Sequence, residues 1–366
     1  MPVVPTPDSR LGFYTLTNAA PRRAGRFAER AEAAGWDGMA VVDSQNLSGD
    51  CYVALTAAAA RTERLGLATG VTNPVTRHPA VTASAIASVH EYSKGRATLG
   101  IGRGDSSLAH LGRAPARIRE FSAYLDALQT YLRGDPVPFD ALSFHEQVAP
   151  DVSSLGLADT AEASRILWLP SSLAKVEVEV AATGPRVIGL AACKADRIMF
   201  ALGADPERLR WGIETARKAR VDAGLDPQAI RFGAYVNLVC HPRIETAREL
   251  VKGSLTTFAR FQVMHGKIAG PMNEEQRRVL GTLHDRYDMK RHTQTGSPQT
   301  RTLDPEFIDQ VAIVGDPAHC VERLGALASL GIERVMVIGP SAGSDREEAA
   351  LAERMIAEEV LPAFHA

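Results

Sequence analysis

Short apolar runs alternate with amphipathic stretches along almost the whole chain. In the amphipathic stretches the apolar residues recur every three or four positions, which predicts helices, whereas the short runs rich in Val, Ile and Ala predict strands. The predicted strands span residues 10–16, 37–43, 65–71, 95–102, 175–182, 196–202, 230–240 and 333–339. The predicted helices span residues 22–35, 52–63, 80–93, 116–134, 185–194, 206–224 and 346–364.

This alternation predicts an α/β fold, a (β/α)8 TIM barrel, because parallel strands need crossover helices and a closed sheet leaves no edges. The alternative is a doubly wound open sheet, but no GxGxxG follows the first strand as in dinucleotide-binding folds. We expect one domain over residues 1–366, with insertions after strands four and seven, at about 136–172 and 266–309. The first insertion is expected to pack on the barrel rim. The second is polar, and we expect a long loop that serves as a lid.

Charge and cysteine content narrow the class of protein further. The chain has 41 Lys and Arg against 43 Asp and Glu, a net charge of −2, and it lacks a basic run. We therefore expect neither nucleic acid nor a membrane as partner. The four cysteines lie far apart and form no metal-binding or paired motif, which is typical of reduced thiols in a cytoplasmic protein. No metal site is predicted, because His265, His284 and His292 have no fixed spacing.

In such a barrel the active site lies where the strands end, so the residues after each strand are the candidates. The fifth strand is followed by the turn Ala182, Thr183, Gly184, Pro185 and Arg186. A proline suits the first helical position, and the free N–H groups of a helix start bind anions. The turn is therefore a candidate phosphate site. Alternatively, Thr183 only caps the helix.

Two further strand ends carry candidate chemistry. The fourth strand ends in Gly102, Arg103, Gly104 and Asp105, where the glycines admit a ligand, the arginine can bind phosphate and the carboxyl can move a proton. A glycine turn with a surface ion pair is the alternative.

Asp43 closes the second strand as a candidate acid or substrate anchor, unless it caps the next helix, and His110 is a candidate ligand contact. The first strand contributes Tyr14, Thr15 and Thr17 to the same end of the barrel.

The segment TGVTNPVTRHP, residues 69–79, is longer than a simple turn after the third strand requires. Together with GRATLGIGRGD (95–105), AATGPRVIGLAACKADR (181–197) and the C-terminal run that ends in VMVIGPSAG (335–343), it resembles the bacterial luciferase-like superfamily. The branch it most resembles is that of coenzyme F420-dependent methylenetetrahydromethanopterin reductase.

The resemblance implies a flavin or deazaflavin at the strand ends. In this family the third strand ends in a bulge with a non-prolyl cis peptide that supports the cofactor ring. The matching bond here is Gly70–Val71, with Thr72 and Asn73 bracing it and lining the cleft. The turn 182–186 matches the phosphate-binding turn of the family.

The resemblance leaves the cofactor open between F420 and FMN. Arg103 stands where luciferases bind phosphate, which favours FMN, whereas the segment TGVTNP favours F420. The reductase branch carries an acid at the end of its first strand, where this chain has Tyr14 and Thr15, which argues against a methanopterin substrate.

We therefore expect an oxidoreductase that transfers a hydride between F420 or FMN and a small organic substrate, with Asp105 first among the proton-handling candidates, ahead of Asp43 and His110. The alternatives are an FMN-dependent monooxygenase that uses O2 and a separate flavin reductase, or a non-catalytic protein that shares the fold. A homodimer is implied by the resemblance, through the early helices at residues 52–63 and 80–93.

Overall fold

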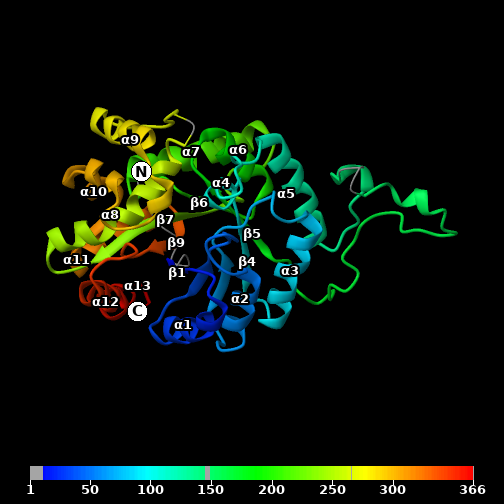
Figure 1. Cartoon of the computed structure of the whole chain (residues 1–366), viewed down its shortest axis with the longest axis horizontal. Coiled ribbons are helices and arrows are strands. Elements are labelled where there is room, and N and C mark those ends of the chain that lie inside the picture. The colour runs from blue at the N-terminus through cyan, green and yellow to red at the C-terminus, as the bar shows by residue number, and fades with distance from the viewer. Residues whose placement is uncertain (1–10, 145–148, 265, 366) are drawn as a thin grey trace.

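The protein is described here from a computed structural model, which defines residues 11–144, 149–264 and 266–365. Within these ranges, eight parallel strands close into a barrel surrounded by helices (Figure 1). The barrel strands are β1 (Gly12–Thr17), β2 (Gly38–Val41), β3 (Gly66–Thr69), β4 (Ala97–Ile101), β5 (Glu177–Ala182), β6 (Arg197–Phe200), β7 (Arg231–Cys240) and β9 (Ile332–Ile338). Closure comes from β9, which pairs with β1 on one side and with β7 on the other. The predicted TIM barrel is confirmed.

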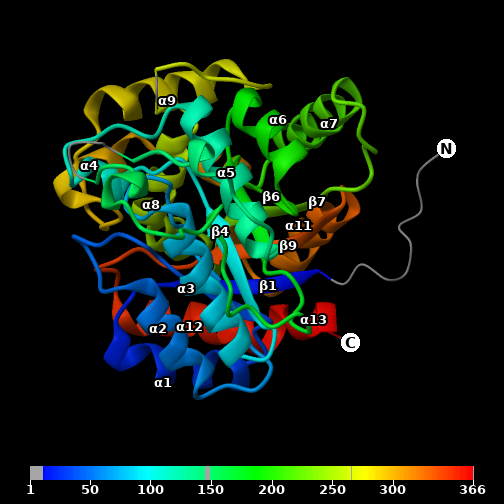
Figure 2. The ribbon, with the colours of Figure 1, turned by 90° about the vertical axis from the view of Figure 1, so that its right-hand side faces the viewer.

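Helices cover the outside of the barrel on all sides (Figure 2). They are α1 (Pro21–Ala33), α2 (Cys51–Ala59), α3 (Pro79–Tyr92), α5 (Ile118–Leu132), α6 (Pro185–Lys194), α7 (Pro206–Asp222), α8 (Ile244–Phe261), α11 (Pro317–Ser329) and α12 (Arg346–Met355). The last residues of the chain return to its start, because the rings of Phe364 and Phe13 lie 5.2 Å apart. No helix in the described ranges has the length and apolar content needed to cross a membrane.

The expectation of a long loop over residues 266–309 was wrong. The segment contains α9 (Glu274–Arg286) and α10 (Pro305–Val311). Asn273 and Gln276 form a reciprocal capping box at the start of α9. The helix has many charged residues and only a narrow apolar stripe of Val279, Leu280 and Leu283, so its sequence pattern did not indicate a helix. The sequence analysis also missed α8, α11 and the three-residue strand β8 (Ile313–Gly315), which pairs with the end of β7.

In its described part, the insertion after β4 is held to the rest of the protein near its ends. Val137 and Ser164 pair in an antiparallel bridge, and the Tyr131 hydroxyl donates to Ser164 Oγ at 2.7 Å. Its outer part projects away from the barrel (Figure 1), and Leu155 and Leu167 in it are 66% and 88% exposed. The contacts of Val137 and Ser164 thus tie the two ends of the insertion together beside α5.

Charged side chains fill one layer inside the barrel. Arg197 donates to Glu179 Oε1 at 3.0 Å, and Arg334 is also ion-paired to Glu179. The Arg334 guanidinium lies over the ring of Tyr14, 4.3 Å from its centre. Because the buried charges are paired, the layer can exist inside an otherwise apolar barrel. Tyr14 therefore belongs to this layer, although the sequence analysis expected it at the active-site end.

The strands β3 and β4 approach each other unusually closely at Gly100. A Cβ at this position would lie 2.2 Å from the carbonyl oxygen of Thr69. Thr69 donates its hydroxyl to the Gly100 carbonyl at 2.7 Å, and the Thr72 N–H reaches the same carbonyl at 3.0 Å. Only glycine leaves space for this arrangement, which determines where β3 ends.

We expect Gly100→Ala to lower the free energy of unfolding by about 1–3 kcal/mol, because the added methyl group meets backbone that cannot easily move. Gly281→Ala is the matched control, since a Cβ there meets nothing within 4 Å and the residue lies within α9. The control should be stabilising by roughly 0.5–1 kcal/mol. Urea unfolding of both variants measures the difference, and equal effects would contradict the close approach.

Candidate active site

A cavity of about 270 Å³ opens at the C-terminal ends of the barrel strands. Strand ends form one part of its lining: Leu16, Gly70, Val71, Gly102, Ala181 and Thr183. Side chains from α8 and the segments beyond form another: Thr257, Phe258, Phe261, Met264, His292 and Thr293. Mostly apolar lining with a few polar groups is typical of sites for cofactors and small molecules.

The end of β3 forms part of this lining. The peptide bond between Gly70 and Val71 is cis, as the resemblance implied. A Cβ on Gly70 would lie 2.7 Å from Leu16 Cδ1 and 2.9 Å from Ala40 Cβ. The backbone at Gly70 therefore packs directly against the side chains of these two residues. Both Gly70 and Val71 face the cavity.

Asn73 holds the loop that follows the bulge. Its Oδ1 accepts hydrogen bonds from the N–H groups of Val75 and Thr76 at 3.0 and 3.1 Å. Its Nδ2 donates to Ser107 Oγ at 3.4 Å, which links the loop to the segment after β4. Asn73 and Thr72 are buried beside the cavity without forming its lining, so the structure gives them a bracing position.

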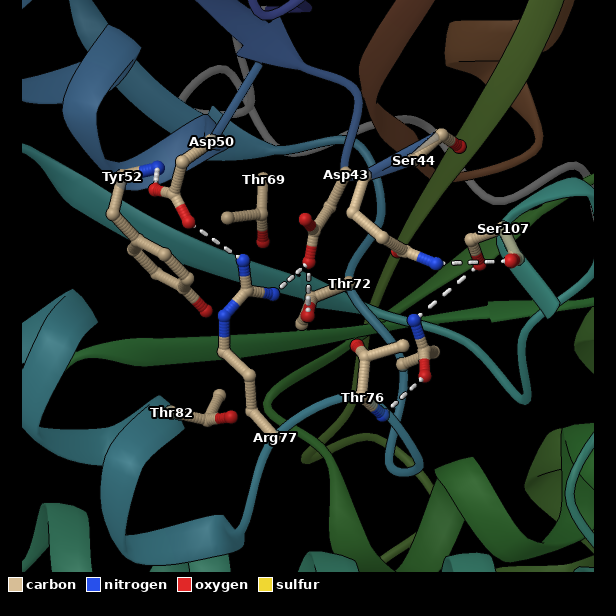
Figure 3. Close-up of polar contacts among 12 residues, drawn as sticks. Asp43, Ser44, Asp50, Tyr52, Thr69, Thr72, Thr76, Arg77, Thr82 and Ser107 are labelled. Carbon is tan, nitrogen blue, oxygen red and sulfur yellow. Dashed lines mark hydrogen bonds and ion pairs between the residues drawn. The ribbon is translucent and has the colours of Figure 1, made fainter. Parts of the chain in front are cut away.

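Arg77 reaches back from the same loop to the end of β2 (Figure 3). Its guanidinium is ion-paired to Asp43, and its Nη2 donates to Asp50 Oδ2 at 2.8 Å. The Thr72 hydroxyl donates to Asp43 Oδ2 at 2.7 Å. Burial acts to lower the pKa of Arg77, but the hydrogen bonds to Asp43 and Asp50 outweigh it and raise the pKa. These contacts explain why a long polar segment follows the third strand.

Asp43 thus lines the cavity with its carboxylate already engaged by Arg77 and Thr72. It does not cap the next helix, because Asp50 does so by accepting from the N–H groups of Tyr52 and Val53. His110 is exposed and does not contribute to the described lining of the cavity. Of the three proton-handling candidates, the structure therefore brings Asp43 and Asp105 to the cavity and leaves His110 outside it.

Asp105 lies at the start of the short helix α4 (Ser106–Ala109) and is ion-paired to Arg260 of α8. Burial raises the pKa of Asp105, although the positive charge of Arg260 acts in the opposite direction. Arg260 also lies over the ring of Tyr287, 4.8 Å from its centre. Arg260 was not predicted as a site residue because α8 was not predicted, although the spacing of Val251, Leu255 and Phe258 by four and three residues indicates a helix after β7.

The turn at residues 182–186 opens α6 as predicted, with Gly184 as N-cap and Pro185 as the first helical residue. No side chain caps this helix, so Thr183 does not have the capping role considered as an alternative. Thr183 lines the cavity, Ala182 is buried behind it and Arg186 is exposed at the rim.

Arg103 lies on the lining near Arg186, and its Nε donates to the Ala116 carbonyl at 2.7 Å. Burial lowers the pKa of Arg103, and the positive charge of Arg186 lowers it further. Two neighbouring guanidinium groups beside an uncapped helix start form an environment that favours an anion. The residues present therefore fit the phosphate-bearing tail of a flavin-type cofactor.

The described residues contain no group of three or more His, Cys, Asp or Glu placed to hold a metal ion. His265 lies outside the described residues, His284 lies next to Asp285 on α9, and His292 lines the cavity.

Comparison with known proteins agrees with this geometry. Residues 7–334 match the luciferase-like monooxygenase family. The 5,10-methylenetetrahydromethanopterin reductase of Methanolobus tindarius is 25% identical over 342 residues, which cover 92% of this chain and 94% of the relative.

Several solved structures share the fold. The coenzyme F420-dependent tetrahydromethanopterin reductase of Methanopyrus kandleri superimposes with a TM-score of 0.72 at 21% identity, over 97% of this chain and 99% of the other. The oxygenating constituent of 3,6-diketocamphane monooxygenase from Pseudomonas putida, in complex with FMN, gives a TM-score of 0.63 at 18% identity, over 97% and 98%. With the family match over most of its length, this chain belongs to the luciferase-like monooxygenase family.

Proposed function

We propose that the protein is an oxidoreductase that holds F420 or FMN in the strand-end cavity and transfers a hydride between the cofactor and a small organic substrate. The observation that carries the proposal is that the closely packed backbone at Gly70 and Val71 and the uncapped start of α6 lie at one cavity. The bulge provides a surface for the flat ring of the cofactor. The helix start, together with Arg103 and Arg186, provides a binding site for the phosphate of the cofactor. When bound, the reduced cofactor supplies the hydride.

The relatives support F420 as the first choice. Relatives that match over most of this chain are methylenetetrahydromethanopterin reductases, and a solved reductase of the same fold is F420-dependent. The reaction of those proteins does not transfer directly, because this chain has Leu16 on the cavity lining at the end of β1 and no acid there.

An FMN-dependent monooxygenase that uses O2 and a separate flavin reductase is the second candidate. It is favoured by the family match and by Arg103 on the cavity lining. Such a reaction needs a site from which water is excluded. Residues 287–301 would provide this, since His292 and Thr293 already cover part of the cavity.

The chain's own residues have distinct tasks in this proposal. Thr72, Asn73 and Arg77 keep the bulge in place, and Asp43 anchors Arg77. Asp105 holds Arg260 beside the cavity, and proton transfer by Asp105 itself stays a prediction, which the pH–rate profile of Asp105→Asn tests.

Cofactor titration tests the proposal most directly. We expect the fluorescence of F420 or FMN to be quenched when the cofactor binds to the protein. Arg103→Ala and Arg186→Ala should each weaken binding roughly 10- to 100-fold, because hydrogen bonds to charged groups contribute about 1.5–3 kcal/mol. Arg119→Ala is the control, because this side chain is 91% exposed and is ion-paired to Glu120, its neighbour in α5. Binding of neither cofactor, or equal binding by all variants, would contradict the proposed site.

We also propose a cytoplasmic homodimer. The four cysteines are free thiols, which suits a reducing compartment. The exposed faces of α2 and α3 carry Val53 and Val81, which are 56% and 54% exposed, together with Thr56, Ala60 and Ser88. Uncharged faces of this kind on neighbouring helices are typical of surfaces that pack against a second copy.

The dimer predicts a specific effect of charge on this surface. Val81→Asp should convert a dimer into a monomer in multi-angle light scattering, because a carboxylate would be buried without a partner. Val221→Asp on α7 is the matched control, since Val221 is 59% exposed on another face. A wild-type monomer, or equal behaviour of both variants, would rule out this interface.

A further inference from the structure

A hydrogen-bonded pair of side chains in the segment after α9 reaches the cavity through His292. His292 lies on the lining, and its Nδ1 is 2.8 Å from the Tyr287 hydroxyl. The same hydroxyl is 3.3 Å from the Thr257 hydroxyl of α8. No hydrogen bond from another described residue reaches the second ring nitrogen of His292, Nε2. Tyr287 therefore holds the imidazole of His292 at Nδ1, and Nε2 can bind a ligand.

Both members of the pair are uncharged at neutral pH. Burial lowers the pKa of His292 to about 4, and the positive charge of Arg260 acts in the same direction. Burial raises the pKa of Tyr287, against the influence of Thr257 and Arg260. A neutral imidazole has one donor and one acceptor nitrogen, and the partner at Nδ1 determines which is which.

Arg260 lies beside the pair, and the carboxylate of Asp105 balances its positive charge. Arg260 lies over the Tyr287 ring and is ion-paired to Asp105, which also lines the cavity. Positive charge is therefore retained beside the Tyr287 hydroxyl without an excess of charge in the cavity. Asp105, Arg260, Tyr287 and His292 form a continuous series of contacts from the segment after β4 to the segment after α9.

Much of the lining around this pair is apolar. The rings of Tyr235 and Phe258 lie 5.6 Å apart, and those of Phe258 and Phe261 lie 5.3 Å apart. All three residues and Met264 contribute to the cavity. A ligand that occupies this part meets aromatic and thioether surface next to the polar groups of His292, Thr257 and Thr293, which suits a molecule with an apolar body and a hydrogen-bonding oxygen.

We propose that His292 Nε2 binds and protonates the oxygen of an apolar ketone, or receives the proton of the corresponding secondary alcohol, with Tyr287 as its relay partner. The inference rests on the proposed function, which supplies the hydride. It assigns a catalytic role to His292 and a substrate class to the cavity.

The proton balance of ketone reduction follows from these contacts. Hydride addition to the carbonyl carbon moves the π electrons of the C=O bond to oxygen. His292 Nε2–H donates its proton to that oxygen, while Nδ1 accepts the proton of the Tyr287 hydroxyl, so the imidazole stays neutral throughout. The resulting tyrosinate lies beside Arg260 and takes a proton from solvent. Alcohol oxidation follows the same path in reverse.

The binding part of the inference can be tested without cofactor. In protein labelled with 15N-histidine, the His292 signals are identified by their loss in His292→Gln. We expect the ring to stay neutral from about pH 6 to pH 8, and added cyclohexanone to shift Nε2. Tyr287→Phe should change the tautomer balance. The signals of His284, which lies on α9 outside the cavity lining, should not move. A His292 ring that becomes charged in this range, or does not respond to cyclohexanone, would overturn the proposal.

The catalytic part is tested with the cofactor-loaded protein and cyclohexanone. We expect His292→Gln to lower kcat by about 10²- to 10⁴-fold and to leave cofactor affinity unchanged, because general acid catalysis contributes on this scale. His284→Gln should retain full activity. If the wild-type protein binds no cofactor or reduces no ketone, the proposed function is wrong. If the wild-type protein is active and His292→Gln is equally active, only the proposed role of His292 is refuted.

Discussion

The close approach of β3 to β4 at Gly100 is the constraint on which the site depends. Because no side chain stands between the two strands, the carbonyl of Gly100 accepts hydrogen bonds from Thr69 and Thr72 on either side of the bulge. The backbone at Gly70 and Val71 is thereby turned toward the cavity. A larger residue at Gly100 would displace the end of β3, and with it the surface on which the proposed cofactor ring would lie.

A second layer of polar contacts keeps that surface in place. Arg77 connects the carboxylates of Asp43 and Asp50, which come from the end of β2 and the start of α2. Asn73 connects the same loop to Ser107. Since three strand ends share these contacts, displacement of the loop would leave a buried carboxylate without its cation, which is energetically costly. The loop therefore belongs to the rigid part of the site, whereas α8 and the segment after α9 provide the part that faces it.

Much of the site was predictable because its residues directly follow predicted strands. Gly70, Arg103 and Thr183 could be placed at the barrel mouth from strand order alone, and the structure brings all three to the cavity. Tyr14 was misplaced by the same reasoning, because a strand-end rule does not specify depth within the barrel. Arg260 and His292 were not assigned to the site, since they reach it from a helix and an insertion that no local pattern links to the barrel.

The sequence by itself determined the barrel, its strand order and the glycine and proline positions that shape its turns. These follow from local periodicity and from backbone restrictions, which a linear pattern records directly. Only the tertiary structure decided which charges are paired: Arg77 with Asp43, Arg260 with Asp105 and Arg197 with Glu179. The ionic partners come from segments far apart in the chain, and their proximity exists only once the barrel has closed around them.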